Sequence, residues 1–216
     1  PSIKLFISLD NESESDDVIN FSEIMEKYEG EYNGSPDPDK VCAIVFTSGT
    51  TGFPKGVMSS HRNFVYSAGS VHVACPTTRM LCCLPIHHSF CFTGNITKSI
   101  VKGKTVCVND NLANLIQDLQ LYKPDSILAV PQLVKKIMFG AMKFAAAHPE
   151  LPQEKAINSF LGGNIIDIIS GGAPLEAALN ETFNSTGILV LNGYGMTECT
   201  PIISNNSVGN FRPGSV

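Results

Sequence analysis

The sequence lacks the features that mark two classes of protein, those that span membranes and those that bind nucleic acid. None of its apolar runs approaches the roughly 20 residues that a transmembrane helix needs. Its 15 lysines and arginines are outnumbered by 20 aspartates and glutamates, and the formal net charge of the 216 residues is −5. A chain without a basic excess offers no large positive face to nucleic acid or to anionic lipid. We therefore expect no transmembrane segment and no nucleic-acid partner.

Cysteines are present, but they match neither a disulfide framework nor a zinc site. Their number is seven, which is odd, and most lie in apolar runs such as MLCCLP and TVCVND. Zinc ligands recur in pairs at short spacing, whereas Cys82 and Cys83 are adjacent and the nearby histidines repeat no such spacing. We expect buried, reduced thiols, which are typical of a cytoplasmic protein.

The first 40 residues differ in pattern from the rest of the chain. A short strand is expected at residues 3–9 and a short helix at 20–29. The Gly, Pro, Asn and Asp residues of 29–40 then predict a solvated connection. We interpret residues 1–40 as an incomplete N-terminal strand, helix and linker, and residues 41–216 as the core domain.

In the core domain, apolar runs of strand length alternate with segments of helical length. The runs occupy residues 41–46, 80–85, 104–109, 126–131, 165–170 and 188–192, and the helical segments occupy 62–73, 90–101, 112–122, 132–147 and 175–184. Continuously apolar strands are typical of a sheet that is buried on both faces. The alternation predicts an α/β fold around a largely parallel sheet.

Glycine-rich polar segments follow three of the expected strands. They are TSGTTG after the first run, GGAPL after the fifth and GYGMTE after the sixth. Ligands of α/β folds collect at the carboxyl ends of the strands. We therefore expect the three segments to form one composite site.

The segment TSGTTGFPKGV at residues 47–57 has the composition of a phosphate-binding loop. Its glycines let backbone amides approach an anion, its hydroxyls donate hydrogen bonds, and Lys55 adds a positive charge. It is not the P-loop of nucleoside triphosphatases, because Pro54 precedes Lys55 and Gly56 follows it. By composition alone, an ordinary surface loop is the alternative. The candidate phosphate-binding residues are Thr47, Ser48, Gly49, Thr50, Thr51, Gly52 and Lys55.

The order of residues in TSGTTGFPKG resembles the phosphate loop of the AMP-forming adenylate-forming enzymes. This family includes acyl-CoA synthetases, luciferases and the adenylation domains of peptide synthetases. Other motifs of the family return in this sequence, in the family's order and at similar spacings. The resemblance implies that Lys55, the loop amides and magnesium hold the β- and γ-phosphates of ATP. Within the family, the chain looks most like a long-chain fatty acid–CoA ligase.

LPIHH at residues 84–88 resembles the family segment that lies between the nucleotide and the acyl pocket. His88 matches the family position, so the resemblance implies that His88 lines the site, whereas His87 is the additional histidine. The alternative for His88 is a packed or hydrogen-bonded residue at a strand end.

SGGAPL at residues 170–175 resembles the family's adenine-side loop, with a plain strand-to-helix turn as the alternative. Its candidate nucleotide-binding residues are Gly171, Gly172, Ala173 and Pro174. The glycines would let the backbone pass against a flat base, and Pro174 would open the following helix.

NGYGMTE at residues 192–198 resembles a further family motif. It implies that Tyr194 stacks on adenine, that Thr197 contacts the α-phosphate and that Glu198 is a magnesium ligand. Its candidate nucleotide-binding residues are Asn192, Gly193, Tyr194, Gly195, Met196 and Thr197.

The resemblance implies a ligase that uses ATP, Mg²⁺ and coenzyme A. A carboxylate attacks the α-phosphorus of ATP and forms an acyl-adenylate and pyrophosphate, and coenzyme A then accepts the acyl group. The enzyme's task is positioning and charge neutralisation, and the residues expected to act in the reaction are Lys55, Thr197, Glu198 and His88.

The acid itself is expected to have an uncharged tail. Amino-acid-activating members of the family place a carboxylate near the pocket, but residues 84–102 contain no Asp or Glu. This favours a fatty or aryl acid, with Phe90, Cys91 and Phe92 as pocket walls or as ordinary core. An amino acid stays an alternative.

The resemblance covers nearly the whole chain but only part of the family's length. We expect a middle piece of the large N-terminal domain, without the family's ribose-binding aspartate, hinge, adenylation lysine and small carboxyl-terminal domain. Such a piece is expected to bind nucleotide without full turnover. Two other functions stay open, namely a kinase or nucleoside triphosphatase and a non-catalytic nucleotide-binding or scaffold protein of the same fold.

Overall fold

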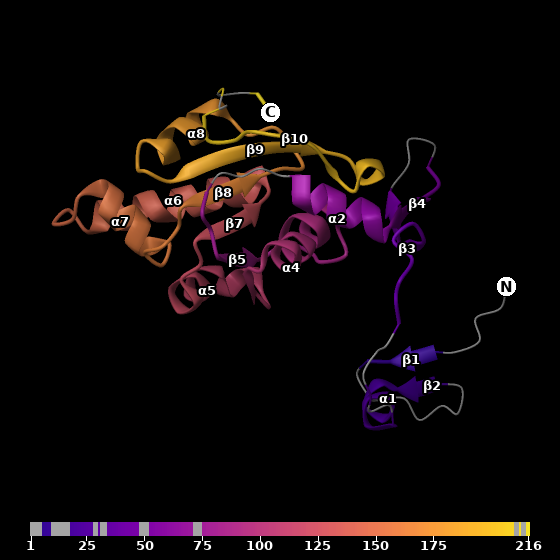
Figure 1. Ribbon diagram of the computed structural model, residues 1–216. Helices are drawn as coiled ribbons and strands as arrows, with labels where there is room; N and C mark the ends of the chain where they lie inside the picture. Colours follow the sequence, from indigo (N-terminus) through magenta and orange to yellow (C-terminus); the bar gives the residue numbers. More distant parts are fainter. Residues whose placement is uncertain are drawn as a thin grey trace. The chain divides into compact units, whose positions relative to one another are not determined.

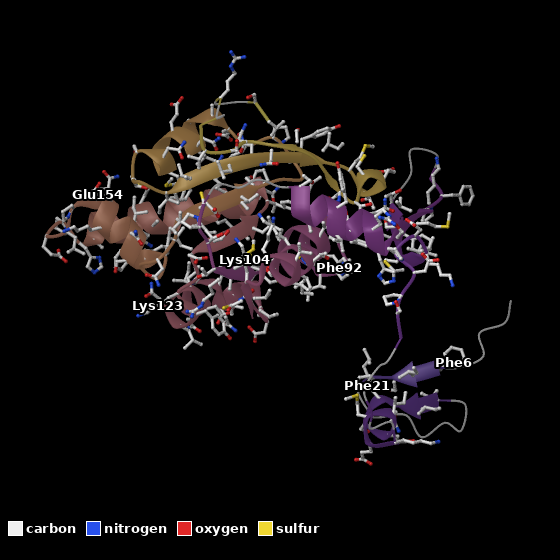
Figure 2. All side chains as sticks on the ribbon, viewed as in Figure 1. Phe6, Phe21, Phe92, Lys104, Lys123 and Glu154 are labelled. Carbon is white, nitrogen blue, oxygen red and sulfur yellow. The ribbon has the colours of Figure 1, made fainter. Side chains whose placement is uncertain are left out.

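The structure is a computed structural model that describes residues 6–9, 18–27, 30, 34–47, 52–70, 75–209, 212 and 215–216. The chain forms two compact units, Pro1–Pro36 and Asp37–Val216. In the first unit, β1 (Phe6–Ser8) pairs in parallel with β2 (Val18–Asn20), and α1 (Phe21–Lys27) follows directly. Phe6 and Phe21, both labelled in Figure 2, are exposed. The sequence predicts β1 and α1, whereas β2 was not expected.

A six-stranded sheet forms the centre of the second unit (Figure 1). In spatial order its strands are β6 (Thr105–Val108), β5 (Arg79–Cys82), β7 (Ser126–Ala129), β8 (Asp167–Ser170), β9 (Leu189–Gly195) and β10 (Ile202–Asn205). All neighbours run parallel except β10, which is antiparallel to β9. All residues of the two central strands, β7 and β8, are buried. The predicted α/β fold with a largely parallel sheet is therefore confirmed.

One face of the sheet builds the main hydrophobic core. Helices α5 (Leu115–Tyr122), α6 (Pro131–Ala147), α7 (Gln153–Phe160) and α8 (Ala177–Asn184) contribute to this core, and a short 3₁₀ turn, η2 (Leu112–Asn114), precedes α5. Because side chains alternate along a strand, Ile127 and Ile168 point into this core, whereas Leu128 and Ile169 point to the other face. Helix α7 was not expected from the sequence.

A nearly continuous helical segment covers the other face. It comprises α3 (Ser89–Cys91), the π-helical turn η1 (Phe92–Thr97) and α4 (Lys98–Lys102), and it packs with α2 (His61–Ser70). Phe92, labelled in Figure 2, meets Phe64 of α2 edge-on, with ring centroids 5.1 Å apart. Asn95 Nδ2 donates to the Leu81 carbonyl at 2.9 Å and so ties η1 to strand β5. The sequence predicts this helix, at residues 90–101, but not its π turn.

The sequence pattern suggested that the apolar run starting at residue 41 belongs to the parallel sheet, but the structure places it elsewhere. It is β3 (Val41–Thr47), and it forms a separate antiparallel hairpin with β4 (Lys55–Ser60). The connection at residues 48–54 is too short for the crossover of at least ten residues that a parallel pair requires. Side chains on the hairpin, Ile44, Phe46 and Met58 among them, are largely exposed. No helix among the described residues is both long and apolar enough to cross a membrane.

Candidate active site

The carboxyl ends of β5, β8 and β9 bring three of the sequence motifs to one edge of the sheet. A cavity of about 210 Å³ lies there. Its polar lining includes His88 from the first motif, Gly172 from the second, and Tyr194 and Thr197 from the third. Ser89 Oγ lies 3.3 Å from Thr197 Oγ1, so a hydrogen bond joins segments that are 108 residues apart in the chain. Two of the three glycine-rich segments expected to form one site, GGAPL and GYGMTE, thus meet at this edge together with LPIHH, whereas no described residue of TSGTTG lines the cavity.

His88 has a defined tautomer because it caps helix α3. Its Nδ1 accepts a hydrogen bond from the Phe90 backbone N–H at 3.1 Å. A neutral imidazole that accepts at Nδ1 carries its proton on Nε2. The His88 side chain is exposed and lines the cavity, so Nε2–H is a donor at the site. The capping bond makes His88 both a structural residue and a lining residue.

A second cavity, of about 390 Å³, adjoins the first and shares Gly172 and Tyr194 with it. Ala173, Pro174 and Asn192 also line it. The Tyr194 side chain is 54% exposed, which leaves a ring face open for stacking. Asn192 Oδ1 is buried and has no hydrogen-bond partner among the described residues.

Two glycines of the motifs are required by close packing. Gly171 lines neither cavity, because the Phe90 ring packs against it, and an added Cβ would lie 2.7 Å from Phe90 Cζ. At Gly195, an added Cβ would overlap the Pro201 carbonyl oxygen on the chain that returns into β10. Gly172 has φ +85°, in the left-handed region that favours glycine. These positions let the motif backbone fold tightly around the cavities.

The hairpin that carries the expected phosphate loop approaches the site from another side. Thr47 and Lys55 are paired residues at the ends of β3 and β4, where the connecting loop begins and ends. Ser59 Oγ of β4 lies 3.3 Å from Thr200 Oγ1, just after the 3₁₀ turn η3 (Thr197–Cys199). Thr47, Gly52 and Lys55 line neither cavity. The other loop candidates, Ser48, Gly49, Thr50 and Thr51, lie outside the described residues.

Glu198 has the properties expected of a single protein ligand for magnesium. Its side chain is exposed on η3 beside Thr197, and none of its contacts with described residues is a hydrogen bond or an ion pair. Magnesium at nucleotide sites is held through one or two carboxylates, and phosphate oxygens and water supply the other ligands. Within the described ranges, no group of three or more His, Cys, Asp or Glu residues could hold a metal ion by itself.

Of the three residues expected as pocket walls, the structure brings only one to the cavity. Phe90 lines it, together with Leu128 and Ile169 of the sheet. Phe92 packs on α2, and the buried Cys91 donates from Sγ to the Leu84 carbonyl at 3.2 Å.

Lys98 is a lining residue that the sequence analysis missed. Lys98 follows Gly94 by four residues and Phe90 by eight, and residues at these spacings lie on one side of a helix. This spacing could have identified Lys98, because all three residues line the cavity.

Burial shifts the pKa values of several groups in the second unit. Desolvation is the main cause that lowers the pKa of the Lys98 ammonium to about 8. Desolvation also raises the pKa of the Asp167 carboxyl, against the hydrogen bond from Ser126. It raises the pKa of the Cys75 thiol to about 11 and that of Cys83 to about 12. All seven cysteines lie in the described ranges and are unpaired.

Comparison with known proteins places this site in a family. The family described as AMP-binding enzyme matches residues 1–216. Luciferin 4-monooxygenase of Photuris pensylvanica is 31% identical over 186 residues, which are 82% of this chain and 32% of the relative. 4-coumarate–CoA ligase-like 2 of Arabidopsis thaliana is 30% identical over 172 residues, which are 77% of this chain and 28% of the relative. The chain spans about 30% of the length of these relatives.

A solved structure has the same arrangement of elements. O-succinylbenzoate coenzyme A synthetase from Bacillus subtilis, in complex with ATP and a magnesium ion, superposes with a TM-score of 0.68. It is 25% identical, over 88% of this chain and 38% of that chain. The family match extends over the whole sequence and agrees with the motifs that line the two cavities. The chain belongs to the AMP-binding enzyme family.

Proposed function

We propose that the protein activates a carboxylic acid with ATP and transfers the acyl group to coenzyme A. The observation that carries this proposal is the convergence of three motifs around two adjoining cavities, joined by the contact between Ser89 and Thr197. The names of the relatives support it, because they include a 4-coumarate–CoA ligase-like protein and a coenzyme A synthetase with bound ATP and magnesium.

The reaction has two steps. An oxygen of the acid's carboxylate attacks the α-phosphorus of ATP, and the bond from that phosphorus to the bridging oxygen of pyrophosphate breaks. The thiol of coenzyme A then attacks the acyl carbonyl, loses its proton and displaces AMP. Neither step needs a covalent bond to the protein, so the site acts by positioning and by neutralising charge.

The adenylate would be divided between the two cavities. The larger cavity would hold adenine, with its ring on Tyr194 and Asn192 beside it. Thr197 Oγ1 and His88 Nε2–H would donate hydrogen bonds to the α-phosphate or to the acid's carboxylate. Lys55 and the loop that it ends would hold the β- and γ-phosphates.

Glu198 would hold magnesium through one carboxylate oxygen. When bound, the ion supplies neutralisation of the phosphate charge. Thr197, adjacent to Glu198 on η3, would orient the α-phosphate oxygens.

For the acid, a fatty or aryl carboxylic acid remains the prediction, and fatty acid–CoA ligase the proposed activity. The described residues that line the smaller cavity include no Asp or Glu, so an amino acid's ammonium would find no carboxylate there. The seven unpaired cysteines support a reducing, cytoplasmic setting. Because the chain spans about 30% of its relatives' length, we propose that this segment binds nucleotide without completing turnover.

Calorimetric titration of the 216-residue chain with magnesium-ATP and with AMP tests the nucleotide site. We expect Lys55→Ala to weaken ATP binding about tenfold and AMP binding much less, because only ATP has β- and γ-phosphates. Tyr194→Ala should weaken both ligands. Lys40→Ala, an exposed lysine just before the other strand of the same hairpin, is the matched control. Failure of the folded chain to bind either nucleotide would contradict the proposal.

A non-catalytic nucleotide-binding protein of the same fold is the second candidate. Pyrophosphate exchange distinguishes this candidate from the ligase, because only a ligase catalyses the return of labelled pyrophosphate into ATP in the presence of a carboxylic acid. We expect this exchange from the longer protein that contains the chain. ATP binding without exchange for any of a series of fatty and aryl acids would favour the non-catalytic candidate.

A further inference from the structure

A buried lysine lines the smaller cavity without a partner. Lys98, the first residue of α4, is only 4% exposed. Among the described residues, the ion pairs join Arg62 to Asp39 and Lys135 to Glu176, and the Lys98 ammonium takes part in no hydrogen bond either. A buried lysine is rare unless it is paired, because removing an ammonium from water is costly. Lys98 therefore calls for an explanation beyond packing.

The π turn η1 aligns Lys98 more closely with Phe90 than a regular helix would. In a regular α-helix of about 100° per residue, Lys98 would lie about 80° around the axis from Phe90, eight residues earlier. A π turn takes up an additional residue and reduces that offset to about 20°. Thr97 Oγ1 donates at 3.0 Å to the carbonyl of Phe92. The two residues are five positions apart, which is the spacing of hydrogen-bond partners in a π turn. Phe90, Gly94 and Lys98 consequently line the same cavity.

The groups that act on the Lys98 charge lie toward the end of the sheet opposite the motifs. The charged and titratable groups that act on it are Asp167, Lys104 and Cys75, together with Lys102 of its own helix. The first three lie at or before the amino-terminal ends of β8, β6 and β5, whereas His88, Gly172 and Thr197 lie at the carboxyl edge. Strand β8 has four residues, so these two ends are about 10 Å apart.

None of these neighbours pairs with the ammonium. Asp167 is the only carboxylate among them; its Oδ1 accepts from Ser126 Oγ at 2.5 Å, and its buried Oδ2 attracts the ammonium without a hydrogen bond to it. Lys104, labelled in Figure 2, is a like charge and donates to Thr77 Oγ1. The apolar side chains of Phe90, Leu128 and Ile169 also line the cavity. The cavity therefore combines polar groups at the carboxyl edge of the sheet, an apolar lining and the buried Lys98.

We propose that Lys98 determines specificity by selecting an acid with a second carboxylate at the end remote from the activated carboxyl. This inference rests on the proposed function, because it assigns the smaller cavity to the acid. The apolar walls hold the body of the acid, and the Lys98 ammonium donates to the remote carboxylate. The cavity volume is about seven times the roughly 30 Å³ of one water molecule, which suits a short dicarboxylic acid. This inference narrows the proposed fatty or aryl acid to one that also carries a charged remote end, in place of the expected uncharged tail.

The test compares two acids that differ only at the remote end, octanoate and octanedioate. Calorimetry with the 216-residue chain is expected to show octanedioate binding at least tenfold more tightly, because a hydrogen bond between two charged groups is made only with the diacid. Lys98→Met, which keeps the length and apolar stem of the side chain, should abolish or reverse this preference. Lys102→Met is the matched control, since Lys102 is exposed one turn later on the same helix.

The outcomes separate this inference from the proposed function. Equal binding of both acids by the wild type, an unchanged preference in Lys98→Met, or no binding of either acid would each overturn the role of Lys98. Pyrophosphate exchange on the longer protein then reports on the reaction. Exchange with octanoate but not with octanedioate overturns the inference and keeps the ligase. A preference for octanedioate that Lys98→Met abolishes, without exchange for any acid, supports the anion site and contradicts the ligase.

Discussion

Lys98 and Asp167 are two buried ionisable side chains whose charged forms are both disfavoured by desolvation. The pKa of Lys98 is lowered to about 8, and the pKa of Asp167 is raised. The attraction between the two opposite charges opposes both shifts without cancelling either. In the absence of a bound acid, the buried charge of Lys98 therefore lowers the free energy of unfolding.

The cost of Lys98 is expected to depend on pH. Unfolding returns its pKa from about 8 to the ordinary value of 10.5, so the unfolded chain binds more protons between these values. The free energy of unfolding should therefore rise with pH through this window. Lys98→Met should stabilise the protein at pH 7 by on the order of 2–3 kcal/mol, and the difference should shrink as the pH approaches 10.

Urea unfolding at pH 7 to 10 measures this effect, with circular dichroism as the signal because the sequence has no tryptophan. Lys102→Met is again the control and should change the pH dependence much less than Lys98→Met, because Lys102 is only one of several charges that act on Lys98. Destabilisation by Lys98→Met that is the same at every pH would mean that Lys98 acts by packing and not by its charge.

At the scale of elements, the turn from β9 into β10 shapes the mouth of both cavities. Gly195 ends β9, and the Met196 backbone N–H donates to the Pro201 carbonyl at 2.8 Å across the turn. That same carbonyl leaves no room for a Cβ at Gly195. At Gly193, two residues earlier on the strand, the nearest atom to an added Cβ is the Ser170 carbonyl oxygen at 3.8 Å. Close packing therefore explains the glycine at position 195 but not the glycine at position 193.

Alanine substitutions distinguish these two positions. Gly195→Ala should lower the free energy of unfolding by about 1–3 kcal/mol or more, since the backbone of the turn must shift. Gly193→Ala should change it by less than about 1 kcal/mol, because its Cβ meets only ordinary contacts. Urea unfolding midpoints of both variants test this. Similar losses for the two variants would contradict the packing explanation for Gly195.

At the scale of the whole molecule, the chain divides into two compact units, Pro1–Pro36 and Asp37–Val216. The second unit contains the six-stranded sheet, the hairpin and both cavities. A chain of residues 37–216 should therefore unfold at the same urea concentration as the full chain, with the same slope for that transition. A midpoint lowered by the deletion would show that residues 1–36 stabilise the core.

Much of the fold could be predicted because its signals are local. The runs at residues 126–131 and 165–170 are continuously apolar, and both became fully buried central strands. Glycine-rich motifs after two strands of the sheet predicted the edge at which the cavities formed. The run at residues 41–46 was placed wrongly, because apolar composition alone does not tell a sheet strand from a hairpin strand.

Short segments were enough to predict the parallel sheet and the polar motifs at its carboxyl edge, since strand burial and backbone freedom are local properties. Which side chains reach the cavity depended instead on how the helices pack on the sheet. Phe92 and Lys98 lie in one predicted helix, yet only Lys98 lines the cavity, whereas Phe92 packs on α2. The offset of a side chain around a helix depends on the hydrogen bonds of the preceding turns, and the π turn, which Asn95 ties to β5, changes that offset here.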